Sequence, residues 1–195
     1  MDLENIVIDS AQPQRLGRFW AAALGAEPLT QTRDLVEVRL SHPGGPILDV
    51  CLPKVLHRPR PTRLRLDLRG GQRQKEVVRR LVSMGAAGTD SGQRGGPWVV
   101  LADPEGHVFR VLPQRGDDPD TGPIAAIPID SAAPERDAAF WQAITGWSLA
   151  EGVAPVSLRH PCGRGPVLEF WPEPEAKGDK NQLHLDVRLG PGETA

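Results

Sequence analysis

The sequence predicts an α+β fold assembled from β-α-β-β-β modules, with one complete pair of modules followed by a partial second copy. Two observations predict it. A Phe-Trp pair followed by glycine occurs twice, in "GRFWAAALGAEPL" (17–29) and in "AAFWQAITGWSLA" (138–150). Around each copy, an alternating segment typical of a strand precedes a segment with helical spacing. Self-similarity over most of a chain indicates a tandem duplication.

Composition places the chain among ordinary globular proteins. Its 195 residues are 25% charged and 39% hydrophobic, and the formal net charge is -2. Cys51 and Cys162 are too few for a disulfide framework and lack the paired spacing of a zinc site. No apolar run approaches the roughly 20 residues of a membrane span, and the first residues lack a basic leader. We therefore expect a cytoplasmic protein with no membrane partner.

One segment, residues 54–80, is strongly basic, which raises the question of a nucleic-acid partner. In "TRLRLDLRG" (62–70), however, the basic residues alternate with leucine, so they form one face of a strand. Acidic residues elsewhere balance them. We expect no nucleic-acid binding.

The first module is expected over residues 3–54. The segment "ENIVIDS" (4–10) alternates as a strand with one buried face does. A helix then begins at Pro13 and ends at Gly25, because proline suits the first helical position and glycine the C-terminal cap. Its apolar stripe contains Leu16, Phe19, Trp20, Ala23 and Leu24. Strand candidates at 35–43 and 46–54 complete the module.

The second module is expected over residues 62–113. It comprises a strand at 63–69, a helix at about 73–84 and a hairpin at 98–112. The hairpin turns at Asp103-Pro104-Glu105-Gly106, which is turn chemistry between two strands. The two modules together predict a first domain over residues 1–113.

A linker over residues 114–122, rich in Gly, Pro and acids, leads to a partial second domain at 123–195. There "IPIDSAAPERDAAFWQAITGW" (127–147) parallels residues 6–26. The segment "NQLHLDVRLG" (181–190) parallels residues 62–70, so that Arg65 matches His184 and Asp67 matches Asp186. No counterpart of residues 73–113 follows it in the sequence.

These motifs resemble the vicinal oxygen chelate superfamily, in particular its glyoxalase-like and bleomycin resistance-like branch. The resemblance is carried by "FWAAALG" and "FWQAITG", by the strands "RLRLDL" and "QLHLDV", and by the hairpin "WVVLADPEGHVFRVL". It implies paired modules whose curved sheets close around a cavity. Metalloenzymes of the superfamily, such as glyoxalase I and extradiol dioxygenases, hold a divalent ion on side chains from the first and last strands of two modules.

The positions that the resemblance assigns to metal ligands do not suit a metal here. They are Asn5, Asp49, Arg65 and Arg110 in the first domain, and Ala126, Glu169 and His184 in the second. A guanidinium stays protonated and offers no lone pair, so two arginines repel a cation. We therefore expect no metal or other cofactor in the first domain.

Strand alternation instead predicts a charged cavity, on which Arg65 and Asp67 lie opposite the leucines of their strand. Two interpretations stay open. Arg65 and Arg110 could clamp a carboxylate or phosphate of a ligand. They could equally form a structural cluster of ion pairs with Asp49 and Asp67.

The second copy adds further candidates. Trp171 shares a strand face with Glu169, so it could stack on a flat ligand or pack in the core. His184 with Asp186 could form a carboxylate-oriented general base, although residues two apart on a strand do not touch closely. His160-Pro161 is interpreted as a turn, as is His42-Pro43, and the sequence indicates no Cys-His dyad.

The sequence thus predicts a protein that binds a small organic molecule between modules, with organic anions among the candidates. The expected ligand-binding residues are Asn5, Asp49, Arg65, Asp67, Arg110, Glu169, Trp171 and His184. An alternative is a metal-dependent lyase or dioxygenase whose site is completed at a subunit interface around Glu169 and His184. A third interpretation is that the incomplete half pairs with its copy in another chain, which predicts a homodimer.

Overall fold

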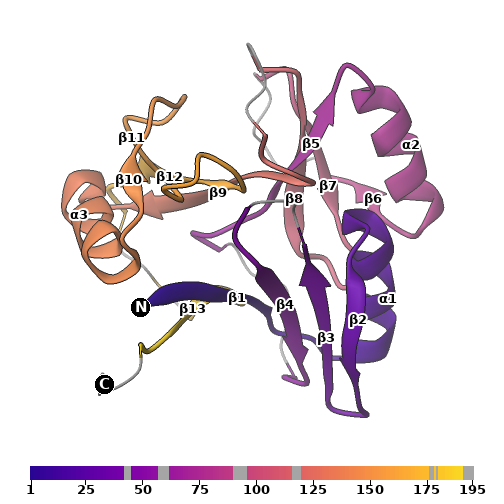
Figure 1. The fold of residues 1–195 in the computed structure, drawn as a ribbon. Coiled ribbons are helices and arrows are strands. Elements are labelled where there is room, and N and C mark those ends of the chain that lie inside the picture. The colour runs from indigo at the N-terminus through magenta and orange to yellow at the C-terminus, as the bar shows by residue number, and fades with distance from the viewer. Residues whose placement is uncertain are drawn as a thin grey trace.

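The computed structural model describes residues 1–41, 45–56, 62–89, 96–115, 120–175, 178 and 180–190. In these ranges the chain forms three helices and thirteen strands (Figure 1). In chain order they are β1 (Asp2–Ile8), α1 (Pro13–Leu24), β2 (Glu27–Gln31), β3 (Leu35–Leu40), β4 (Leu48–Pro53), β5 (Asp67–Gly71), α2 (Gln74–Ser83), β6 (Ala87–Gly88), β7 (Val99–Ala102), β8 (Val108–Pro113), β9 (Ile124–Ser131), α3 (Pro134–Thr145), β10 (Ser148–Leu149), β11 (Val156–Arg159), β12 (Val167–Pro172) and β13 (Leu183–Arg188). None of the helices has the length and hydropathy that crossing a lipid bilayer requires.

Three successive β-α-β-β-β modules confirm the predicted fold class: β1 to β4, β5 to β8, and β9 to β12. The helix of the first module begins at Pro13 and ends at Gly25, whose φ of 65° is the left-handed conformation that glycine adopts without strain. The strand predicted from residue 63 begins later, at Asp67, because Leu64 forms only an isolated bridge, to Ile129.

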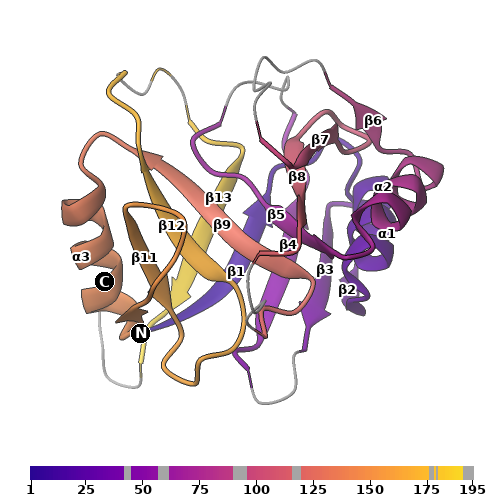
Figure 2. The ribbon, with the colours of Figure 1, turned by 90° about the horizontal axis from the view of Figure 1, so that it is seen from above.

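The modules pair differently from the expectation. The first module joins β13 in a five-stranded sheet of order β13-β1-β4-β3-β2. The second and third modules share an eight-stranded sheet of order β10-β11-β12-β9-β5-β8-β7-β6, in which β9 crosses to lie beside β5 (Figure 2). The expectation that modules 3–54 and 62–113 close around one cavity is therefore wrong.

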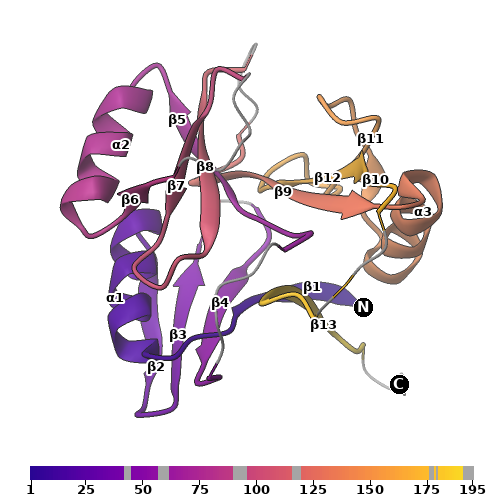
Figure 3. The same ribbon diagram turned by 180° about the vertical axis from the view of Figure 1, so that it is seen from behind.

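Strand edges explain why pattern alone does not reveal this pairing. The first strand of each complete module uses one edge for the last strand of its own module and leaves the other edge free. Strand β1 uses its free edge for β13 (Figure 3), and β5 uses its free edge for β9. In these two pairs Asp186 lies opposite Asn5, and Asp67 lies opposite Ala126. The duplication seen in the sequence is thus repeated in the strand register.

The first two modules pack against each other through helices and aromatic rings, with α1 and α2 stacked on one side of the molecule (Figure 1). The ring of Trp20 on α1 meets Phe109 of β8 at 5.3 Å, and Phe19 packs edge-on against Trp20 at the same separation. Aromatic pairs of this geometry add about 0.5–1.5 kcal/mol beyond the area that they bury. The first Phe-Trp pair is therefore the centre of the interface between the modules.

The second Phe-Trp pair lies in a different environment. Phe140 on α3 is 59% exposed, whereas Phe19 is 4% exposed. The difference arises because β8 places Phe109 against α1, and no described element covers α3 in that way. The homodimer expected from this half of the chain stays a prediction.

The Asp103–Gly106 turn fastens the second module to the start of α1. Helix α1 has no N-cap side chain of its own, since Gln12 caps nothing. Glu105 supplies the cap from the other module: its carboxylate accepts from Ser10 Oγ at 2.9 Å, from the Ala11 N–H at 2.7 Å and from the Gln12 N–H at 2.8 Å. A carboxylate at this place also complements the positive end of the helix dipole.

Replacing Glu105 with alanine should lower the free energy of unfolding by about 1–2 kcal/mol, the usual worth of a helix cap. Urea denaturation followed by circular dichroism measures this loss. Glu76→Ala, at an exposed carboxylate in the first turn of α2, is the control and should change stability by less than about 0.5 kcal/mol. Equal stability of the two variants would contradict the capping role.

Candidate functional site

Charged side chains gather on the face of the eight-stranded sheet that points away from α2 and α3. We call this surface the eight-strand face and define it by residues from β5, β8, β9, β11 and β12 with the segments beside them. Its members are Arg65, Asp67, Trp98, Arg110, Arg115, Asp130, Ser157, Arg159, Glu169 and Trp171. Alternate residues on the same strands, such as Leu68, Val111 and Phe170, point into the apolar core. The period of two in the strands thus separates charge from core.

The centre of the face is a buried ion pair between Asp67 and Arg110. These two residues lie opposite each other on β5 and β8, and Arg110 donates from Nε to Asp67 Oδ1 at 2.7 Å and from Nη2 to Oδ2. Asp67 is 0% exposed. The guanidinium also lies 4.7 Å from the ring centroid of Trp98, in cation–π contact. Every charge of this pair is therefore compensated inside the protein.

A second ion pair lies on β12. Glu169 is 2% exposed and accepts from Arg115 Nη1 at 2.8 Å and from Trp171 Nε1 at 3.1 Å. The indole of Trp171 is thus turned toward the carboxylate on the same strand face. This bond orients the ring, and the bond from Arg115 is charge-assisted.

A third ion pair, at the edge of the face, leaves a donor unused. Arg65 Nη1 donates to both carboxylate oxygens of Asp130, at 3.1 and 3.0 Å. Its Nε is buried and has no hydrogen-bond partner. The protein therefore supplies acceptors for Nη1 of Arg65 and none for its Nε among the described residues.

Further buried polar atoms on the same face are also unsatisfied. Trp98 Nε1, Ser157 Oγ and Arg159 Nε have no partner among the described residues. Ser157 and Arg159 lie on β11, whereas Trp98 lies beside Arg110 of β8, so β12, β9 and β5 separate these atoms on the face. Nearly all buried polar groups in proteins are hydrogen-bonded, so a group of unsatisfied ones needs an explanation. Three of the four are obligatory donors, which would be satisfied by an acceptor.

The five-stranded sheet presents a second polar face, opposite α1, which we call the five-strand face and define by Asn5, Glu37, Arg39, Asp49, Cys51, His184 and Asp186. Arg39 holds Asp49 in a two-bond ion pair at 2.9 and 2.8 Å. The hydrogen bond to Asp49 and the negative charge of its carboxylate raise the pKa of Arg39 above its ordinary value.

Cys51 on this face is an unreactive thiol. Burial, reinforced by the carboxylate of Glu37 at 3.6 Å, raises the pKa of Cys51 to about 12. A thiol with that pKa stays protonated at neutral pH, and the thiol is a far poorer nucleophile than the thiolate.

His184 lies on the same face of β13 as Asp186. Its Nε2 is 3.7 Å from Asp186 Oδ1, too long for a hydrogen bond, and its buried Nδ1 has no partner. The carboxylate-oriented base that the spacing suggested is therefore not assembled by these two residues.

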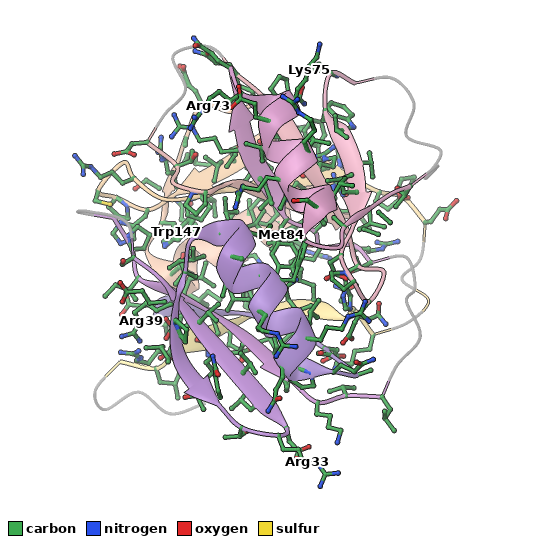
Figure 4. All side chains as sticks on the ribbon, turned by 90° about the vertical axis from the view of Figure 1, so that its right-hand side faces the viewer. Arg33, Arg39, Arg73, Lys75, Met84 and Trp147 are labelled. Atoms are coloured by element: carbon green, nitrogen blue, oxygen red, sulfur yellow. The ribbon has the colours of Figure 1, made fainter. Side chains whose placement is uncertain are left out.

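A cavity of about 520 Å³ opens between the five-strand face and the third module. Its lining includes Arg39 and Asp49 from the sheet, and Trp147 and His160 from the third module. Trp147 and Arg39 lie on the same side of the molecule (Figure 4). Four of its five charged side chains form two ion pairs, Arg39 with Asp49 and Arg188 with Glu4, and the fifth is Asp2. Little uncompensated charge therefore faces a ligand.

The structure divides the predicted site residues between the two faces. Arg65, Asp67, Arg110, Glu169 and Trp171 come together on the eight-strand face, whereas Asn5, Asp49 and His184 lie on the five-strand face. Asp49 forms no ion pair with Arg65 or Arg110 among the described residues, because Arg39 binds Asp49, Asp130 binds Arg65 and Asp67 binds Arg110. Glu169 and His184 are likewise separated, in β12 and β13.

Neither face fits a divalent cation. On the eight-strand face, both buried carboxylates already bind a guanidinium, which would have to leave before a metal could enter. On the five-strand face, Arg39 occupies Asp49 in the same way. Within the described ranges, no group of three or more His, Cys, Asp and Glu side chains is placed to hold a metal ion.

Some functional groups could not be identified from the sequence. Arg115 falls in the segment interpreted as a linker, and only the fold brings it to Glu169. His160, interpreted as a turn residue, has its Nδ1 2.8 Å from Cys162 Sγ. The prediction that the chain has no Cys-His dyad is therefore wrong. The signal was present as "HPCG", a turn sequence that brings residues two apart together. His42 lies outside the described residues.

Comparison with protein families finds one match. The family model described as a glyoxalase-like domain matches residues 5–112 and 126–195 of this chain. Among curated proteins, none matches the sequence significantly.

Solved structures share the fold at low identity. Glyoxalase I from Zea mays has a TM-score of 0.59 at 15% identity, over 87% of this chain and 66% of that one. A single-residue variant of the same enzyme has a TM-score of 0.61 at 15% identity, with the same coverage. A candidate dioxygenase from Bacillus subtilis has a TM-score of 0.59 at 16% identity, over 93% of this chain and 66% of that one. The chain thus spans slightly less than two thirds of the length of these structures.

Proposed function

Because the chain belongs to the glyoxalase-like domain family of the vicinal oxygen chelate superfamily, we propose that it binds a small organic anion on the eight-strand face without a metal ion. One observation carries the proposal. The buried Nε of Arg65 has no acceptor among the described residues, although Nη1 of the same guanidinium is held by Asp130.

An anion is the ligand that these donors favour. A carboxylate or phosphate offers several lone pairs and no proton, so it can accept from an unpaired guanidinium donor such as Arg65 Nε. Arg65 retains a donor for such a ligand, because Asp130 binds only its Nη1 and leaves Nε without an acceptor. Arg110 is unsuited to the same task, since both of its bonded nitrogens already serve Asp67. Trp171 lies on the same face and offers a flat apolar surface to the organic part of the ligand.

The ion pairs of the face take the place of a metal in this proposal. Asp67 and Glu169 are neutralised by Arg110 and Arg115, so the face carries fixed charges in place of a bound cation. Binding should therefore be unaffected by a chelator, and metal analysis of the purified protein should show no stoichiometric divalent ion. The metal-dependent alternative predicts the opposite for both measurements.

Arg65→Ala tests the proposal. A panel of aliphatic and aromatic carboxylates and organic phosphates is screened by thermal shift, and the hits are quantified by isothermal titration calorimetry. We expect the variant to bind the best hit about 10–100-fold more weakly, since hydrogen bonds to charged groups contribute about 1.5–3 kcal/mol. The variant should fold normally, because the Asp130 that it leaves behind is partly open to solvent.

Arg73→Ala is the matched control. Arg73 lies at the start of α2 (Figure 4), and its side chain is 80% exposed. Its removal takes away one positive charge without touching the eight-strand face, so affinity should not change. If no anion of the panel binds, or if both variants bind as the unaltered protein does, the proposal is wrong.

A further inference from the structure

The connection between β11 and β12 holds a cysteine and a histidine in contact. His160 Nδ1 lies 2.8 Å from Cys162 Sγ, and the Cys162 N–H donates to the same Nδ1 at 3.2 Å. A ring nitrogen that accepts an N–H bond carries a lone pair at that position and not a proton. The thiol proton of Cys162 therefore has an acceptor within reach.

The local chain keeps this contact in place. The Gly163 N–H donates to the His160 carbonyl at 2.9 Å, which closes a turn around Pro161 and Cys162. Proline restricts φ at the second position, and Gly163 follows with a φ of 70°, which favours glycine. On its other side, the ring of His160 lies edge-on to Trp147, at 6.0 Å and 90°. Trp147 is itself buried, so the imidazole packs against a rigid part of the third module.

The thiol is also accessible. Cys162 is exposed, and His160 lines the 520 Å³ cavity beside the five-strand face. A reagent can thus approach the sulfur from solvent. Cys51 is the opposite case, since burial and Glu37 raise its pKa to about 12. The chain therefore contains one accessible thiol beside a base and one protected thiol beside an acid.

Charged groups around the turn are largely paired. Arg164 lies 3.7 Å from Asp120, and Arg159 donates to the carbonyl of Asp120 at 3.1 Å. Across the cavity lie the pairs of Arg39 with Asp49 and of Arg188 with Glu4, and the carboxylate of Asp2. His160 is therefore the group placed to take the proton from Cys162.

We propose that Cys162 and His160 form a reactive thiol site that exchanges with low-molecular-weight disulfides. The thiol proton passes to His160 Nδ1, and the Cys162 thiolate attacks one sulfur of the disulfide R–S–S–R. A new S–S bond joins Cys162 to one R–S group while the old S–S bond breaks. The leaving R–S⁻ takes the proton from His160 and departs as R–SH. The site does not depend on the eight-strand face, so it stands or fails separately from anion binding.

The test measures the rate of exchange with the chromogenic aromatic disulfide dithiobis(nitrobenzoate). The full chain carries Cys51→Ser, so that Cys162 alone reacts, and it is compared with the same protein carrying His160→Asn in addition. Asparagine can still accept the Cys162 N–H but is not a base. At about pH 7 the histidine variant should react about 10-fold or more slowly, the lower range for general-base assistance. At about pH 10, above the ordinary thiol pKa of about 8.5, the two rates should converge.

Two results would overturn the proposal. Equal rates at about pH 7 would show that His160 gives no help, and an equal slowing at both pH values would show that it only shapes the turn. Should Cys51→Ser fail to fold, mass spectrometry after brief labelling compares the extent of label on Cys162 in the unaltered chain and in His160→Asn. Cys162 should be labelled about 10-fold or more slowly in the variant at about pH 7, and equal labelling would count against the site.

Discussion

Replacing Arg110 with methionine is expected to lower the free energy of unfolding by about 3–5 kcal/mol, because it leaves a fully buried carboxylate without its partner. Asp67 receives both of its charge-assisted bonds from Arg110 and is 0% exposed, so water cannot replace the guanidinium. Methionine keeps most of the side-chain volume beside Trp98. Urea denaturation followed by tryptophan fluorescence measures the loss.

Two further variants separate loss of the partner from loss of packing. The double variant Asp67→Leu/Arg110→Met removes both charges, and it should recover most of the stability, since a buried ion pair is often no better than an apolar pair. Arg73→Met removes an exposed arginine 4.0 Å from Glu76 and should cost less than about 0.5 kcal/mol. A loss below about 1 kcal/mol for Arg110→Met would show that Asp67 is not confined as described.

Asp103→Ala is expected to cost about 3 kcal/mol or more, because one buried carboxylate satisfies several donors. Asp103 accepts from Trp20 Nε1 at 3.1 Å, from His107 Nδ1 at 2.9 Å, and from the backbone N–H groups of Glu105 and His107 at 2.9 and 3.0 Å. Its loss leaves the buried indole N–H unpaired and loosens the turn that places Glu105 on α1.

Near-ultraviolet circular dichroism and urea denaturation measure the Asp103 effect together. The near-ultraviolet circular dichroism signal of Trp20 should weaken, and the urea concentration at the midpoint of unfolding should fall. Asp34→Ala removes a carboxylate 3.1 Å from Lys54 that is 68% exposed, and it should leave both readings unchanged. If Asp103→Ala behaved like this control, the turn would not be the link between the first two modules.

Local patterns were sufficient for the helices α1 and α2 and for most strands of the first two modules, although they did not indicate β2 or β6. Pro13 and Gly25 bound α1, and the leucines of the strands mark the core side, because these signals act within a few residues. Part of the eight-strand face follows from the same rule. Asp67 and Arg65 share a face by alternation, and Trp171 and Glu169 do so on β12.

The chemistry of that face depended on contacts between distant residues. Of the two partners considered for the arginines, Asp67 is bound by Arg110, whereas Asp49 is bound by Arg39 in the other sheet. Arg115 reaches Glu169 from a segment with no periodic pattern at all. Such pairs have no signature in spacing, since charged side chains combine with whichever opposite charge the fold brings near.

The sequence by itself determined the repeated β-α-β-β-β modules and the apolar and polar sides of each strand. These follow from periodicities of about two and 3.6 residues, which belong to the chain wherever it lies. Only the tertiary structure decided that β5 pairs with β9 and β1 with β13, and so which charges share a face. A free strand edge offers the same row of N–H and C=O groups to any partner, so the choice among partners depends on the packing of whole modules.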